Sequence, residues 1–209
     1  MFMSKDVIDS SDAIKPNFYT KYVKTTIDFI LALIALIILS PLMIVIAIII
    51  KVTSEGPVLF KQERLGLHQK VFKVYKFRSM CLNAEHIGDG IRARDADDPR
   101  ITPVGKFIRK TSIDELPQLI NILKGEMAIV GPRPPVTYHP YPRGEYDEVK
   151  KHRFDVKPGL TGLAQAKIRN QGTWDERIVY DVQYVQDVSF LGDCKIIYET
   201  IFTVAKLDK

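Results

Sequence analysis

Two consecutive acidic residues, Asp114 and Glu115, are the strongest candidates for chemistry in this sequence of 209 residues. They follow Arg109 and Lys110, and a carboxylate held beside cations stays ionised and can attack phosphorus. Ser112 precedes Glu115 by three residues, which is the spacing of a capping box and predicts a helix start with Asp114 in its first turn. Spacing alone favours a capping role for Glu115, and a nucleophile at Asp114 is the alternative.

Three further cations lie within or beside segments whose backbone is predicted to be rigid or to form a turn. Arg133 lies in Gly131-Pro132-Arg133-Pro134-Pro135, where stiff backbone would reduce the entropy lost when its guanidinium grips a phosphate. The alternative is a plain connector with a solvated arginine. Pro158-Gly159 predicts a type II turn, and Lys157 and Arg169 flank that turn as candidates for binding an anionic substrate.

Asp95 and Asp97 form a DxD pair, the pattern with which many glycosyltransferases hold a nucleotide-bound metal. No strand-like run precedes them, so we interpret this segment as a solvated loop. The sequence has no GxGxxG, Walker, HExxH or GxSxG motif, and its four histidines are scattered. These absences argue against a histidine-rich metal site and a serine-histidine hydrolase.

An apolar run must position this chemistry relative to a membrane. Residues 29–50 carry no formal charge, and as a helix they would cover roughly 33 Å, about the hydrocarbon thickness of a bilayer. Ser40-Pro41 near the middle predicts a kink, because proline removes one backbone hydrogen bond. Lysines on both sides favour two cytoplasmic ends and therefore a re-entrant helix, with a kinked span and a buried core helix as alternatives.

The remainder is typical of an α+β fold, with a mainly helical cytoplasmic domain and a short β-hairpin anchored by the re-entrant helix. We divide the chain into a polar tail (1–20), the membrane helix (21–52) and a catalytic domain (53–209). Strands are expected at 58–60 and 71–77, around a turn at Gly66, and at 127–130. Helices are expected at 104–110, 113–123, 145–154, 174–186 and 193–206, and a surface loop at 87–99.

Composition narrows the class of protein. The net charge is +5 and hydrophobic residues make up 46% of the chain, which excludes a disordered or polytopic membrane protein. A basic body beside an apolar segment suits anionic lipid or phosphate-bearing ligands, and charge alone also admits nucleic acid. Cys81 and Cys194 are far apart and form no ligand spacing, so a reducing compartment is expected.

Taken in order, these segments resemble the bacterial sugar transferase family, the small monotopic phosphoglycosyl transferases that act on polyprenol phosphate. The similarity covers nearly the whole chain from Tyr22 to about Ala205. It rests on the Ser40-Pro41 run and on a series of motifs in register: Phe60-Lys61-Gln62-Glu63-Arg64, Tyr75-Lys76-Phe77-Arg78-Ser79-Met80, Asp98-Pro99-Arg100-Ile101-Thr102, Arg109-Lys110-Thr111-Ser112-Ile113-Asp114-Glu115-Leu116-Pro117, Leu123-Lys124-Gly125-Glu126-Met127, Gly131-Pro132-Arg133-Pro134 and Lys157-Pro158-Gly159-Leu160-Thr161-Gly162.

The resemblance implies that Asp114 is a nucleophile and Glu115 its partner in a dyad that works with Mg²⁺. It also implies substrate-binding roles for Arg78, Arg109 and Arg133. Two departures are visible. Lys157 stands where relatives commonly have arginine, which keeps the charge and gives up the forked donor, and the segment 166–169 replaces one that more often contains glycine.

The implied reaction is the transfer of a phosphosugar from a nucleoside diphosphate sugar, with a UDP-sugar as the expected donor, to undecaprenyl phosphate, with release of a nucleoside monophosphate. It implies an aspartyl-phosphosugar intermediate, membrane lipids as surroundings and the cytoplasmic face of the bacterial inner membrane as the location. The product would begin a capsule, exopolysaccharide, O-antigen or glycoprotein glycan. No nucleic acid is expected as a partner, and a homo-oligomer is compatible with the sequence.

Two other functions remain as alternatives. One is a membrane-associated glycosyltransferase that moves only the sugar, with a metal on Asp95 and Asp97. The other is a basic membrane-anchored scaffold or nucleic-acid binder without turnover, whose signature would be salt-sensitive binding. The released nucleotide separates the two enzymes, because transfer of the sugar alone leaves a nucleoside diphosphate.

Overall fold

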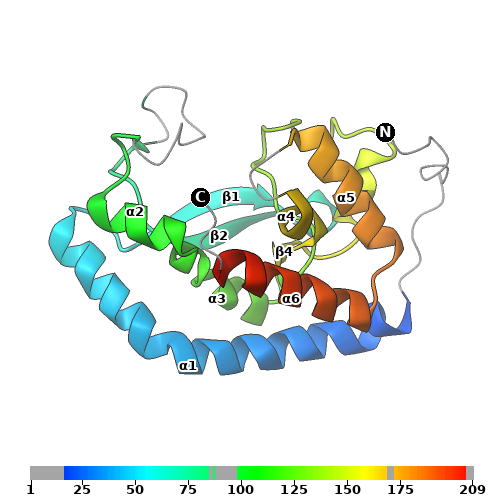
Figure 1. Ribbon diagram of the computed structural model, residues 1–209. Helices are drawn as coiled ribbons and strands as arrows, with labels where there is room; N and C mark the ends of the chain where they lie inside the picture. The colour runs from blue at the N-terminus through cyan, green and yellow to red at the C-terminus, as the bar shows by residue number, and fades with distance from the viewer. Residues whose placement is uncertain (1–16, 85–86, 88–97, 169–171, 206–209) are drawn as a thin grey trace.

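The computed structural model describes residues 17–84, 87, 98–168 and 172–205, with side chains described up to residue 202. Helices and short strands are mixed, as expected for an α+β chain (Figure 1). Most of the predicted polar tail lies outside the described residues. The first described element is a π-helical turn, η2 (Tyr19–Val23), which leads directly into the longest helix.

That helix, α1 (Lys24–Thr53), contains Pro41 and bends visibly along its length (Figure 1). Proline at 41 has no N–H to donate to the carbonyl of Ile37, four residues earlier. The hydroxyl of Ser40 donates to that same carbonyl at 2.8 Å, so the lost bond is replaced. The bend agrees with the kink expected at Ser40-Pro41, and the helix continues through Pro41 as one element.

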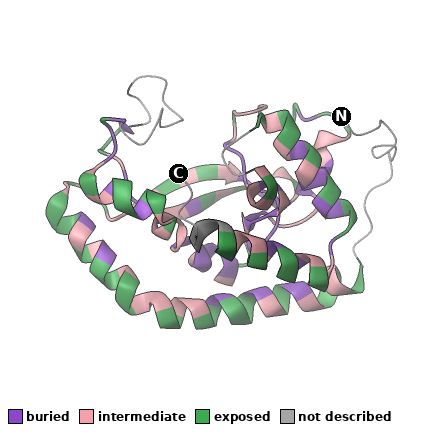
Figure 2. Ribbon diagram, in the orientation of Figure 1, coloured by how far each residue is buried: buried purple, intermediate pink, exposed green. Residues whose placement is uncertain are grey.

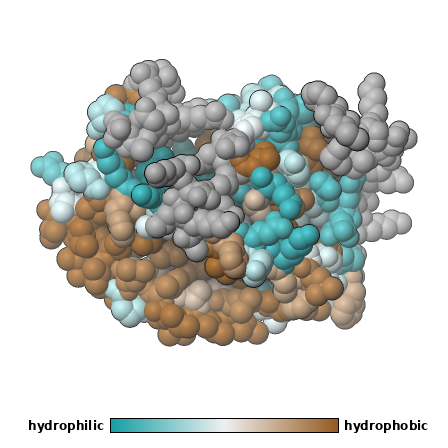
Figure 3. Space-filling model, in the orientation of Figure 1, coloured by the Kyte–Doolittle hydropathy of each residue, from teal (hydrophilic) through white to brown (hydrophobic). Residues whose placement is uncertain are grey.

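One face of α1 packs along the domain. Ala32 lies in a core cluster with Leu119 and Ile122, whereas Ile46 and Ile50 pack with residues that include Phe77 and Ile108. The opposite face is exposed and apolar (Figure 2), and it forms a hydrophobic band along the lower edge of the molecule (Figure 3). Its large exposed side chains are Phe29, Ile30, Leu31, Leu33, Ile34, Ile37, Ile38, Leu42, Ile44, Val45, Ile48 and Val52.

Two small sheets carry the backbone around the site. Strands β1 (Leu59–Leu65) and β2 (Val71–Phe77) form the predicted antiparallel hairpin, closed by the turn η3 (Leu67–Gln69). Strand β3 (Ala128–Val130) pairs in parallel with β4 (Gly159–Thr161).

The parallel pair contradicts the predicted type II turn, because Gly159 begins a strand and is absent from the positive-φ residues such a turn requires. Glycine is needed there for another reason. A side chain on Gly159 would collide with the backbone of Gly131, and one on Gly131 would collide with the backbone at Lys157 and Gly159. The two segments can pair this closely only without Cβ atoms.

Helices cover the strands on both sides. They are α2 (Pro103–Lys110), α3 (Gln118–Leu123), α4 (Leu163–Ile168), α5 (Trp174–Gln186) and α6 (Phe190–Ala205). The helix predicted over 113–123 is divided into a 3-10 turn, η5 (Ile113–Glu115), and α3, with Pro117 as the N-cap residue of α3. Of the helix predicted over 145–154, only the 3-10 segment η6 (Lys150–Phe154) forms.

Candidate active site

Ser112, whose backbone has a left-handed conformation, sets the position of the acidic pair. Helix α2 ends at Lys110, and Ser112 then has φ 57°, which reverses the chain before η5. The side chain of Ser112 makes no capping hydrogen bond. The predicted capping box is therefore wrong, and the carboxylate of Glu115 is used elsewhere.

Glu115 joins two cations that come from distant parts of the chain. Its Oε1 accepts a hydrogen bond from Nζ of Lys76 at 2.7 Å and from Nη2 of Arg133 at 3.0 Å. Lys76 belongs to β2, and Arg133 lies in the proline-rich loop after β3. The side chains of Lys76 and Glu115 are 18% and 20% exposed and that of Arg133 is 35% exposed, so the cluster is sheltered but reachable.

These charges act in opposite directions on the two carboxyl groups. Burial alone would raise the pKa of Glu115, but Arg133 and Lys76 lower that pKa far below its usual range. The pKa of Asp114 is raised to about 6, because burial and the charge of Glu115 raise it and the cations Lys76, Arg109 and Arg133 offset this only in part. Glu115 is thus a fixed anion, and Asp114 is the titratable member of the pair.

The carboxylate of Asp114 is the uncommitted member of the pair. It is partly buried, and within the residues that the structure describes it accepts no hydrogen bond and forms no ion pair. An oxygen that holds no partner is available to attack an electrophile. Adjacent carboxylates with different environments can take different roles.

A fourth cation lies next to this cluster. Arg64, on β1, donates from Nη1 to the carbonyl of Pro134 at 3.0 Å and from Nη2 to Gln62 at 2.6 Å. Burial, and to a smaller extent the neighbouring positive charge of Arg133, lowers the pKa of Arg64 to about 10. The cations Lys76, Arg64, Arg109 and Arg133 therefore outnumber the two carboxylates and create a field that attracts polyanions.

The other predicted site residues lie elsewhere. Arg78 is buried and donates to the carbonyls of Ser54 and Glu55, and so ties the end of α1 to β2. Lys157 lines a cavity of about 180 Å³ between α1 and the end of α3, with Asp28 and Lys124 among the lining residues. Neither contacts Asp114 or Glu115 in the described part of the chain. Arg169 lies outside the described residues, as do Asp95 and Asp97.

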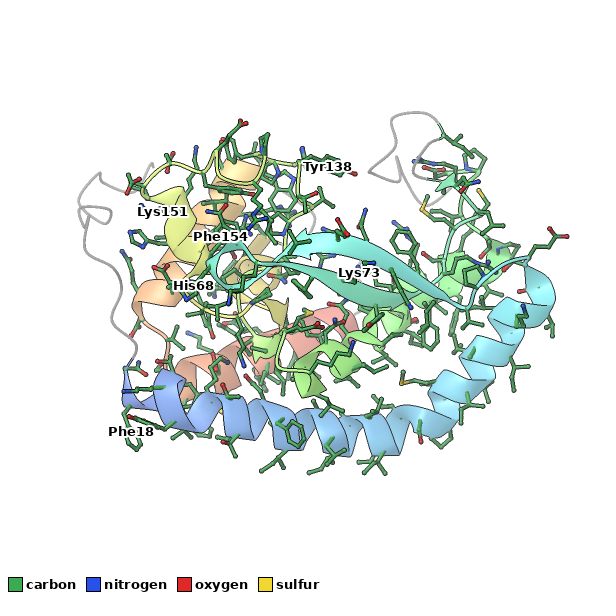
Figure 4. The ribbon with its side chains drawn as sticks, turned by 180° about the vertical axis from the view of Figure 1, so that it is seen from behind. Phe18, His68, Lys73, Tyr138, Lys151 and Phe154 are labelled. Carbon is green, nitrogen blue, oxygen red and sulfur yellow. The ribbon has the colours of Figure 1, made fainter. Side chains whose placement is uncertain are left out.

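Sequence reasoning missed Lys76 and Arg64 as site residues, although both stand in motifs that it noted. The available signal was strand alternation. Along β2 the exposed Lys73 and the partly buried Lys76 differ in face, and only Lys76 meets the turn that carries Glu115. Figure 4 shows Lys73 on the hairpin, away from that turn.

The acidic pair could supply part of the ligand shell of a magnesium ion. No group of three or more His, Cys, Asp or Glu side chains in the described residues could hold a metal by itself. Mg²⁺ in proteins is commonly bound through one or two carboxylates, and substrate phosphates and water complete its shell. Asp114 and Oε2 of Glu115 offer oxygens of that kind.

Comparison with known proteins agrees with this arrangement. The family model described as bacterial sugar transferase matches residues 19–207. The chain is 40% identical over 209 aligned residues to an undecaprenyl-phosphate galactose phosphotransferase of Salmonella typhimurium, and the match covers 90% of this chain and 42% of that protein. It is 39% identical over 188 residues to a UDP-glucose:undecaprenyl-phosphate glucose-1-phosphate transferase of Escherichia coli, with 87% and 40% covered.

A shorter relative is covered over most of its length. The exopolysaccharide production protein ExoY of Sinorhizobium fredii is 38% identical over 191 residues, and the match covers 85% of this chain and 83% of that protein. The chain spans about two fifths of the two relatives named before it. Because the family model spans both the apolar helix α1 and the Asp114 cluster, the chain belongs to the bacterial sugar transferase family.

Proposed function

We propose that this protein transfers a phosphosugar from a nucleoside diphosphate sugar to undecaprenyl phosphate and releases a nucleoside monophosphate. The names of the relatives support the substrates, since they describe sugar phosphotransferases acting on undecaprenyl phosphate and UDP-glucose. The observation that carries the proposal is the uncommitted carboxylate of Asp114 beside Glu115, whose charge is already paired by Lys76 and Arg133.

Asp114 is the nucleophile of the first step. A carboxylate oxygen attacks the phosphorus that bears the sugar, the bond from that phosphorus to the bridging oxygen breaks, and the nucleoside monophosphate leaves with the bond electrons. The product on the protein is an aspartyl-phosphosugar. Lys76, Arg133, Arg64 and Arg109 reduce the repulsion between the carboxylate and the pyrophosphate.

Undecaprenyl phosphate is the acceptor of the second step. One of its phosphate oxygens attacks the same phosphorus, the acyl-phosphate bond breaks, and Asp114 regains its carboxylate. The product is a lipid diphosphate that carries the sugar. Asp114 and Glu115 would hold the Mg²⁺, which when bound neutralises charge on the pyrophosphate and polarises its oxygens.

Helix α1 holds the site at the membrane. It is long and apolar enough to cross a bilayer by length and composition. However, its two ends pack on one domain: Lys24 bonds Asp193 of α6, and Ile50 packs with residues that include Ile108 of α2. A crossing would carry part of that domain into hydrocarbon, where its polar backbone has no partners. We therefore infer that α1 enters and leaves from the cytoplasmic face of the inner membrane.

The test measures the nucleotide that is released. Purified protein in nanodiscs, Mg²⁺ and undecaprenyl phosphate are incubated with a panel of nucleotide sugars. Nucleoside monophosphate is the expected product with at least one of them. Release of nucleoside diphosphate would instead show transfer of the sugar alone, and no release from any sugar would contradict the proposal.

A second experiment tests the nucleophile. The acceptor is omitted and the sugar-bearing phosphate is radiolabelled. The protein should then retain label, and neutral hydroxylamine should release that label because it cleaves acyl phosphates. Asp114→Asn should retain no label and transfer no sugar, whereas Asp187→Asn, an exposed control, should behave as the parent. Turnover in Asp114→Asn would eliminate the assigned nucleophile.

A further inference from the structure

A fully buried ion pair lies behind the loop that carries Arg133. Nη2 of Arg153, in η6, lies 2.6 Å from Oδ2 of Asp181, in α5, and the two side chains are 0% and 1% exposed. The guanidinium also lies near the rings of Phe154 and Trp174, at 5.5 and 5.8 Å from their centroids. Figure 4 shows Phe154 beside the hairpin tip that carries His68, at the centre of this packing.

The same guanidinium holds the backbone of the active-site loop. Nη2 of Arg153 donates to the carbonyl of Arg133 at 2.8 Å. On the β1 side, Arg64 donates to the carbonyl of Pro134 and the backbone N–H of Leu65 donates to the carbonyl of Pro135, both at 3.0 Å. Three consecutive carbonyls of the loop are therefore fixed from two directions.

Stability does not account for this pair. In the described residues Oδ1 of Asp181 is buried without a hydrogen-bond partner, so the pair is not fully satisfied. Unsatisfied buried groups are costly, and replacing a buried ion pair with well-packed apolar residues is often neutral or stabilising. What the pair provides here is a charged donor, the guanidinium of Arg153, that bonds the carbonyl of Arg133.

We propose that Arg153 and Asp181 are positioning residues that hold Arg133 against Glu115. Asp181 fixes the guanidinium of Arg153, Arg153 fixes the carbonyl of Arg133, and the side chain of Arg133 then reaches Glu115 at 3.0 Å. Neither residue contacts the acidic pair itself. This inference rests on the proposed function, because its effect is measured through turnover.

The test is a double-mutant cycle between the buried pair and Arg133. The apolar replacement Arg153→Met with Asp181→Leu should keep the melting temperature near or above that of the parent while kcat falls roughly 10- to 100-fold, since small misplacements at an active site are costly. In an Arg133→Ala background the same replacement should change kcat less than about twofold, because its target is gone.

The chain offers a matched control. Arg100 and Asp98 form a second buried pair at 2.8 Å, and Arg100 donates to the carbonyls of Ala84 and Ile87 rather than to the loop around Arg133. The same apolar replacement there should change kcat by the same factor in both backgrounds. A purely structural role for the Arg153 pair would produce that same pattern and would overturn the proposal.

Single variants cover the case in which the apolar replacement does not fold. Arg153→Lys keeps the charge and Asp181→Asn keeps the shape, and each should lower kcat in the parent background and not in Arg133→Ala. Equal losses in both backgrounds count against the positioning role. If the parent itself releases no nucleoside monophosphate, the proposed function fails instead, so the two failures are distinguishable.

Discussion

Nζ of Lys76 lies 2.7 Å from Oε1 of Glu115, and this contact joins the β-hairpin to the turn that carries Asp114. Lys76 is the residue through which β2 contributes to the site. Without Lys76, Glu115 would keep one directly bonded cation among the described residues, Arg133. Removing one partner of a buried ion pair is costly because the charge that remains is no longer compensated.

Lys76→Met should therefore lower kcat/KM for the nucleotide sugar by roughly 100- to 1000-fold, the order of loss when one preorganised donor is removed from an active site. Lys73→Met is the matched control, because Lys73 is exposed on the same strand. Steady-state kinetics in nanodiscs measure both. Equal rates for the two variants would remove Lys76 from the site.

Glu115→Gln should raise the Mg²⁺ concentration needed for half-maximal activity by about 10-fold or more, because an amide is a weaker ligand than a carboxylate. A magnesium titration at saturating nucleotide sugar measures this, with the exposed Glu63→Gln as control. An unchanged requirement would mean that Glu115 serves only as the counter-ion of Lys76 and Arg133.

Asp114→Asn should unfold at a higher temperature than the parent at pH 7.5. The folded pKa of Asp114 is about 6, above its ordinary 3.8. The folded state thus binds more protons than the unfolded chain between these values, and stability falls as pH rises through this window. The gain from asparagine is on the order of 1–2 kcal/mol above pH 6 and should vanish near pH 4. A gain that is independent of pH would contradict this account.

Cysteines placed before and after the apolar run, Lys21→Cys in η2 and Lys51→Cys in the last turn of α1, should react with an impermeant maleimide from the same side of sealed inverted vesicles. The native Cys81 and Cys194 are both exposed and must first be replaced by serine. Labelling of the two positions from opposite sides would show that the helix crosses the membrane.

Local sequence signals predicted much of this architecture. The hairpin followed from alternating residues around Gly66, and the apolar run with Ser40-Pro41 followed from composition. The capping-box spacing, however, has different outcomes at two places in the chain. Thr173 and Glu176 form a complete capping box at α5, whereas Ser112 and Glu115 do not.

The difference lies in long-range partners. Glu176 has a local use for its carboxylate, but Glu115 meets Lys76 and Arg133, which are 39 and 18 residues away along the chain. Similarly, no local pattern announces that Gly159 pairs with Ala128. The sequence indicated the acidic pair and Arg133 as candidate site residues, but the contacts among them depend on tertiary packing.

The bond between Lys24 and Asp193 has a consequence for synthesis. These residues are separated by 169 positions, so Lys24, which also lies 3.6 Å from Asp28, can bond Asp193 only after those positions have left the ribosome. At a translation rate of about 5–20 residues per second, that interval lasts on the order of ten to thirty seconds. During this interval the apolar helix α1 has been synthesised but α6, which carries Asp193, has not. Correct folding therefore requires that α1 reach lipid early or be bound by a chaperone.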